Sequence, residues 1–178
     1  MSSVELHTLP TEKWESGVEQ LLACLNPWLE SNWQTTLVAA PEEPFYKPAS
    51  LKGSYHQIQF AHGYFSSALH ELAHWCVAGE NRRLLPDYGY WYEPDGRTAE
   101  QQKLFEQVEV KPQAIEWHFT QACQRTFNVS ADNLTGEATD ISRFQKSVTM
   151  QMRYYEQHGL PKRASSIKQR LQAAFQSP

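Results

Sequence analysis

The sequence predicts a single α+β domain over residues 1–178, in which several helices pack on a small β-sheet and a central helix carries a His-Glu-x-x-His motif. Three observations support this fold class. Apolar residues recur at three- and four-residue steps in several long segments, as in amphipathic helices. Two short segments have the character of strands. The length of 178 residues fits one domain, given a typical ~100–200 residues per domain.

Composition and charge exclude several classes of protein. A net charge of −4 and a pI near 6.0 argue against binding nucleic acid or membranes by bulk electrostatic attraction. No apolar run approaches the ~18 residues that a membrane span needs. The N-terminus has no export signal, and the three cysteines contain no CxxC pair. We therefore expect a cytoplasmic protein with no membrane contact and no direct nucleic-acid partner.

The helices are expected where apolar periodicity is strongest. Residues 11–31 should form the first, with Thr11 as its cap, and 64–78 the second. Thr98 should cap a third helix that reaches Phe119. Two further helices are expected over 141–155 and 167–175.

The expected strands are short. Residues 35–40 and 55–61 are the two candidates, and the aromatic segment 87–92 is also compatible with an extended chain. Pro112 should kink or interrupt the third helix, because its ring removes a hydrogen-bond donor and clashes with the preceding turn.

The most informative segment is the His-Glu-x-x-His motif, formed by His70, Glu71 and His74. Residues four apart on a helix lie one turn above each other, so both imidazoles can share one metal ion. Glu71 is rotated by about 100° from His70, beside that ion, where it can accept a proton or hydrogen-bond a water. The alternative is a pair of core histidines hydrogen-bonded to other groups, but a metal ion would satisfy one nitrogen of each ring.

A third protein ligand is needed, and no further histidine follows at the spacing of the metzincin pattern. A carboxylate is therefore expected. Glu106, Glu109 and Glu116 lie on one stripe of the third helix, and such a stripe can also be a solvated face. Glu109, flanked by two valines, is the more enclosed, so we predict Glu109 as the ligand, with Glu106 as the alternative.

A substrate-binding role is predicted for the aromatic segment that follows the motif helix. Aromatic faces attract cations, and nearby carboxylates pair with an ammonium group, so this segment suits a long cationic side chain. Packing in the core or in a strand is the competing explanation. The candidate substrate-binding residues are Tyr90, Trp91, Tyr92, Asp95 and Arg97.

Four blocks of sequence resemble the bacterial elongation factor P hydroxylase family. The likeness is densest from about residue 55 to 135. The blocks are 60–64 (FAHGY) leading into 70–76 (HELAHWC), 89–97 (GYWYEPDGR), 105–114 (FEQVEVKPQA) and 127–134 (FNVSADNL).

The resemblance implies an enzyme that hydroxylates the β-lysylated lysine of translation elongation factor P, which is then its partner. It also implies a fold similar to a small metal-dependent ribonuclease family. Its metal would be iron(II), held by His70, His74 and a carboxylate of the 106–109 block, with dioxygen as cosubstrate. Zinc or another divalent metal can occupy such a site in a purified sample. Two histidines and one carboxylate are the usual ligands of non-haem iron(II) oxygenases.

Two other classes of function use the same residues. A small zinc metallopeptidase would make Glu71 the general base that takes a proton from the attacking water. A non-catalytic adaptor would use the metal only for stability. The motif alone favours the peptidase, whereas the family resemblance favours the hydroxylase.

Overall fold

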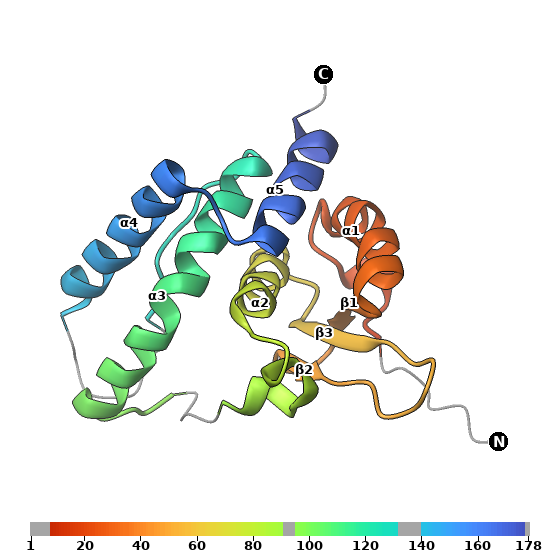
Figure 1. Ribbon diagram of the computed structural model, residues 1–178, viewed down its shortest axis with the longest axis horizontal. Coiled ribbons are helices and arrows are strands. Elements are labelled where there is room, and N and C mark those ends of the chain that lie inside the picture. Colours follow the sequence, from red (N-terminus) through yellow and green to blue (C-terminus); the bar gives the residue numbers. More distant parts are fainter. Residues whose placement is uncertain (1–7, 91–94, 132–139, 177–178) are drawn as a thin grey trace. The chain divides into compact units, whose positions relative to one another are not determined.

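The computed structural model describes residues 8–90, 95–131 and 140–176. The chain forms two compact units, Met1–Tyr88 and Gly89–Pro178, joined directly. The first holds a sheet and two α-helices, and the second holds three α-helices (Figure 1). The predicted α+β class is therefore confirmed. Within the described ranges, no helix has the length and apolar character needed to cross a bilayer.

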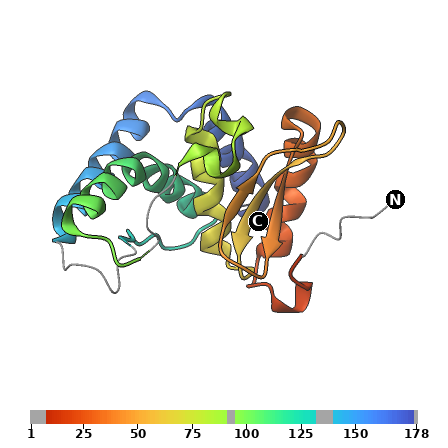
Figure 2. The same ribbon diagram turned by 90° about the horizontal axis from the view of Figure 1, so that it is seen from below.

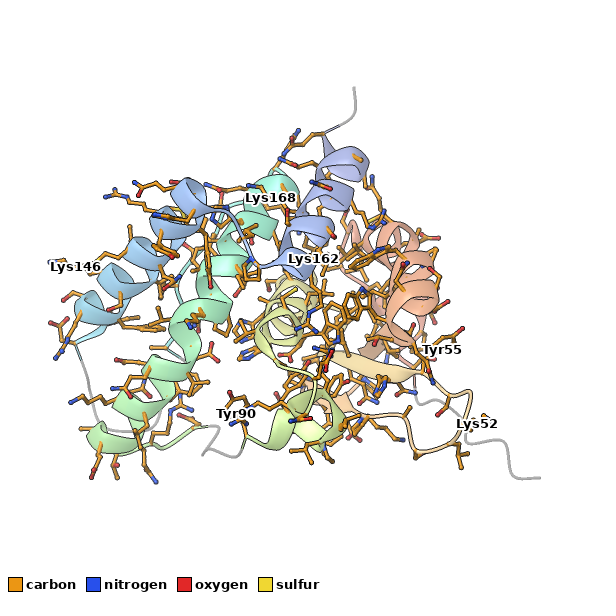
Figure 3. The ribbon with its side chains drawn as sticks, viewed as in Figure 1. Lys52, Tyr55, Tyr90, Lys146, Lys162 and Lys168 are labelled. Atoms are coloured by element: carbon orange, nitrogen blue, oxygen red, sulfur yellow. The ribbon has the colours of Figure 1, made fainter. Side chains whose placement is uncertain are left out.

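The first unit is built on a three-stranded sheet with the order β1-β3-β2. Strand β1 (Thr35–Ala40) pairs in parallel with β3 (His56–Ala61), and β2 (Phe45–Lys47) pairs antiparallel with β3. The parallel register places Leu37 opposite Ile58, and both side chains are buried. Before β3, Lys52 and Tyr55 extend from the connecting loop into solvent (Figure 3).

Two helices pack on this sheet, α1 (Val18–Trp33) against β1 and α2 (Phe65–Val77) against β3 (Figure 2). A side chain of α1 forms hydrogen bonds to the backbone of β1, which is an edge strand of the sheet. The amide of Asn26 donates to the carbonyl of Leu37 at 3.0 Å and accepts from its N–H at 2.8 Å. This carboxamide satisfies the two backbone groups of Leu37, which have no neighbouring strand on this side because β1 is an edge strand.

The start of α2 is held by a segment far away in the sequence. Its N-cap residue, Tyr64, makes no side-chain cap, but Glu15 accepts a hydrogen bond from the N–H of Phe65 at 2.7 Å. Gly63 has φ +71°, and a Cβ there would lie 3.1 Å from the backbone of Trp14. Only glycine allows this close approach without strain.

After α2 the chain makes two 3-10 turns, η2 (Arg82–Leu84) and η3 (Pro86–Gly89). In η3, Asp87 and Tyr88 both have left-handed backbone angles, with φ of 46° and 60°. The turn is stabilised from outside, because the Asp87 carboxylate accepts a hydrogen bond from the N–H of Tyr46 at 2.8 Å. The Tyr88 ring stacks on that of Tyr46 with a centroid distance of 4.2 Å.

The second unit consists of α3 (Ala99–Ala122), α4 (Ile141–His158) and α5 (Lys162–Phe175), and α3 contacts both of the others. Their apolar stripes form its core. Lys146 lies on the solvent side of α4 (Figure 3). The buried apolar residues are Phe105, Ala114, Ile115, Phe119 and Ala122 of α3, Phe144, Val148, Met152 and Tyr155 of α4, and Ala164, Ile167 and Leu171 of α5.

Several sequence predictions are confirmed and others need correction. The first helix does not begin at Thr11: residues Thr11–Lys13 form a separate 3-10 turn, η1, and α1 begins after the left-handed Gly17. The short strand β2 was not predicted. Residues 87–89 belong to the η3 turn rather than to an extended segment, and Tyr90 lies in no helix or strand, while 91–92 lie outside the described residues.

Helix α3 is capped by Thr98 as predicted, and it runs on through Pro112 without interruption. Within the first unit α1 and α2 pack on the sheet, and within the second unit α3 packs on both α4 and α5. That all 178 residues form one functional domain stays a prediction.

Candidate metal centre

The paired imidazoles of His70 and His74 are the centre of the candidate site. Both lie on α2, and their Nε2 atoms are 3.0 Å apart. Both side chains are half-buried, whereas the opposite face of the helix is fully buried through Leu69, Leu72 and Ala73. The helix is therefore fixed by its apolar face, and the two histidines emerge from the core on the same side.

This geometry fits a shared metal ion. Two nitrogens that each lie about 2.1 Å from one ion are about 3.0–3.4 Å apart for angles between 90° and 110° at the metal. The observed 3.0 Å lies within that range. Without an ion, one neutral ring can donate a hydrogen bond to the other across the same distance. With an ion bound, His70 and His74 would each offer Nε2 as a ligand.

Glu71, the middle residue of the motif, is also half-buried. Its negative charge lies close enough to Tyr88 to influence the pKa of the Tyr88 hydroxyl. Burial is the main cause that raises the pKa of Tyr88 well above its ordinary value, and the charge of Glu71 adds to it. Tyr88 is consequently a neutral phenol, able to donate a hydrogen bond.

The Tyr88 hydroxyl is buried and has no hydrogen-bond partner among the residues that the structure describes. Tyr46, on which it stacks, differs in this respect, because its hydroxyl donates to the carbonyl of Arg83 at 2.9 Å. The sequence analysis included Tyr88 in the aromatic segment 87–92 but did not predict a role for it. Only its burial beside the motif helix distinguishes it.

Asp87 connects the η3 turn to the same region of the first unit. Burial raises the pKa of its carboxyl group, while the hydrogen bond from Tyr46 and the positive charge of His74 oppose that rise. The strained turn therefore places an acidic side chain within electrostatic reach of one of the two histidines.

The predicted third ligand, Glu109, lies on α3 in the second unit. It is only 1% exposed, whereas Glu106 is half-buried, so Glu109 is the more enclosed of the two as predicted. Gln113, one turn along, donates to Oε2 of Glu109 at 3.2 Å. Each of the three predicted ligands offers one possible donor atom, an imidazole nitrogen from His70 and from His74 and a carboxylate oxygen from Glu109.

The predicted substrate-binding residues have different surroundings. Tyr90 is at the surface (Figure 3), and Asp95 is exposed, with its carboxylate accepting from the N–H of Gly96 at 2.8 Å. Arg97 is 1% exposed, and its guanidinium lies over Phe105 at 3.7 Å. Trp91 and Tyr92 lie outside the described residues. Their binding of substrate stays a prediction.

Comparison with known proteins identifies the family of the chain. The model of the elongation factor P hydroxylase family matches residues 24–178. The chain is also 47% identical, over 161 residues, to the elongation factor P lysine hydroxylase of Haemophilus influenzae. That alignment covers 90% of both proteins. The chain therefore belongs to the elongation factor P hydroxylase family.

Proposed function

We propose that this protein hydroxylates a modified lysine of translation elongation factor P. The observation that carries the proposal is the His70–His74 pair on α2, whose Nε2 atoms are 3.0 Å apart, in a chain of the hydroxylase family. The relative from Haemophilus influenzae is named for the same activity on the same protein. Because the substrate is a translation factor, the reaction would take place in the cytoplasm.

His70, His74 and Glu109 would hold the metal ion, for which we propose iron(II). This donor set leaves coordination positions open, as in non-haem iron oxygenases, and the bound ion would supply the activation of dioxygen. The chain's own residues would hold that ion and control access to it. The half-buried histidines are reachable from solvent, whereas the buried core of α2 keeps the helix in place.

Glu71 would orient ligands or water beside the metal rather than act as a proteolytic base. The β-lysyl group is long and carries ammonium charge, so aromatic and acidic groups are suited to bind it. We propose that Tyr90, Trp91, Tyr92 and Asp95 contribute to its binding, and that Arg97 supports them from within the second unit.

Intact-mass analysis of β-lysylated elongation factor P tests the proposal directly. The factor would be incubated with the protein, iron(II), ascorbate as a source of electrons, and air. We expect a gain of one oxygen atom that needs both air and iron and is lost in His74→Ala. A substrate of unchanged mass under all these conditions would contradict the proposal. Cleavage of peptides by the zinc-loaded protein would instead support a metallopeptidase.

The ligand assignment has its own test in the metal content of single variants. Replacement of His70 or His74 by alanine should reduce bound metal to background. The helix should still form, because alanine is a strong helix former. Glu109→Ala should lose metal and Glu106→Ala should keep it. The reverse result for the two glutamates would change only the identity of the carboxylate.

A further inference from the structure

Gln113 makes three hydrogen bonds that together fix the orientation of its amide. Its Oε1 accepts from the backbone N–H of Ser130 at 3.1 Å. Its Nε2 donates to the carbonyl of Ser130 at 2.6 Å and to Oε2 of Glu109 at 3.2 Å. The amide of Gln113 thus bonds to both backbone groups of Ser130 and donates its second N–H to the Glu109 carboxylate.

The backbone of Ser130 decides which end of the amide faces Glu109. A backbone N–H can only donate and a carbonyl can only accept, so Oε1 must lie toward the N–H and Nε2 toward the carbonyl. The group that faces Glu109 is consequently a donor. Because Gln113 is 2% exposed, water competes little for these bonds.

A donor on Oε2 restricts the rotation of the Glu109 carboxylate. Carboxylates that ligate metals are commonly oriented by such hydrogen bonds, and their loss weakens metal affinity. We propose that Gln113 is a positioning residue, which holds the Glu109 carboxylate in the orientation required for metal binding and ties it to the loop at Ser130. This inference rests on the proposed role of Glu109 as a metal ligand.

The same helix contains a matched pair that serves as a control. Gln102 donates its Nε2 to Oε1 of Glu106 at 3.1 Å and to the carbonyl of Ala131 at 3.1 Å. Its Oε1 accepts from Arg97 at 2.7 Å. Gln102 therefore also joins a glutamate of α3 to the same loop, but its glutamate is not the proposed ligand.

The test compares Gln113→Met with Gln102→Met. Both changes remove a buried amide, a loop contact and a glutamate contact, and Gln102→Met also deprives the buried Arg97 of an acceptor. The dissociation constant for iron(II), measured without oxygen, is the readout, with thermal unfolding recorded for each variant. We expect Gln113→Met to bind iron(II) ~10–100-fold more weakly than the unaltered protein. Gln102→Met should stay near the unaltered value.

A double-mutant cycle separates positioning from a general effect on the fold. In a Glu109→Ala background, Gln113→Met should cause no further loss of affinity, because the group through which it acts is gone. Gln113→Asn keeps a buried amide but shortens the side chain by one methylene group. Gln113→Asn should therefore also weaken iron(II) binding. It replaces Gln113→Met in the experiment if Gln113→Met does not fold.

Each result has a distinct meaning. Equal dissociation constants for Gln113→Met and the unaltered protein would overturn the inference while leaving the metal site intact. An equal loss in Gln102→Met would also overturn it, because loop anchoring would then explain both. Failure of the unaltered protein to bind iron(II) would instead contradict the proposed function.

Discussion

The carboxylate of Glu15 accepts a hydrogen bond from the backbone N–H of Phe65, at 2.7 Å and across 50 positions of sequence. Phe65 is the first residue of α2, whose own N-cap residue, Tyr64, has no capping side chain. A negative charge at this end also interacts favourably with the helix dipole. The helix that presents His70 and His74 is therefore capped by a side chain from before α1.

We expect Glu15→Ala to destabilise the protein by about 0.5–2 kcal/mol, the usual cost of losing a helix cap. Denaturant unfolding measures this. Glu12→Ala is the control, since Glu12 is exposed in η1 and should change stability little. Equal stability of the two variants would show that the bond to Phe65 contributes nothing.

Glu71→Gln distinguishes the two catalytic mechanisms. The change keeps the size and one acceptor but removes the charge. On the hydroxylase mechanism the variant should keep its metal and a measurable activity, reduced by ~10–100-fold, since Glu71 only orients neighbouring groups. Intact-mass analysis of the substrate measures the remaining rate. A peptidase needs this carboxylate as its base and would lose all turnover.

Tyr88→Phe removes a buried hydroxyl that has no partner among the described residues. Since a buried polar group without a hydrogen bond costs free energy, we expect the variant to gain up to about 1 kcal/mol in the free energy of unfolding. Tyr46→Phe is the matched control. Its hydroxyl donates to Arg83, so its removal should cost about 1 kcal/mol. A loss of stability in Tyr88→Phe would contradict the expectation.

His118 should make stability depend on pH. It is buried between α3, α4 and α5: Nε2 lies 3.2 Å from the carbonyl of Met152, and Nδ1 lies 3.4 Å from Nζ of Lys168 (labelled in Figure 3). Burial is the main cause that lowers the pKa of His118. The charge of Lys168 adds to this, while the bond to Met152 and the charge of Glu156 oppose it.

Because the folded chain binds this proton less readily than the unfolded chain, the free energy of unfolding should be highest above about pH 7.5. It should fall as the pH drops through about 6.5, and level off below the pKa of the folded state. His118→Gln keeps a donor for Met152 but does not titrate. The variant should lose this part of the pH dependence, while the part due to His56, whose pKa burial also lowers, remains. Parallel stability curves for both proteins would contradict the prediction.

Local sequence alone determined most of the regular elements and the histidine pair of the candidate site. The strand over 35–40 and the capping of α3 by Thr98 follow from residues close in sequence, and the structure confirms both. The pairing of His70 with His74 also follows from helix geometry, because residues four apart share one face. These features depend on residues that are close in sequence, so sequence patterns can predict them.

Tertiary structure decided the features that join distant segments. Strand β2 has only three residues and exists because β3 pairs with it. Thr11 looked like a helix cap, yet α1 begins only after the left-handed Gly17. The spacing of Glu109 and Gln113 was visible, but the bond of Gln113 to Ser130 needs the loop to fold back on α3.

The same distinction holds for two residues that interact with other parts of the first unit. The sequence shows Tyr88 only as one of several neighbouring aromatics, and its burial depends on the stack with Tyr46. Glu15 has no local signal for its role, because its partner lies 50 positions away. Periodicity and caps are read from neighbours along the chain, whereas burial and long-range hydrogen bonds are set by the packing of the whole unit.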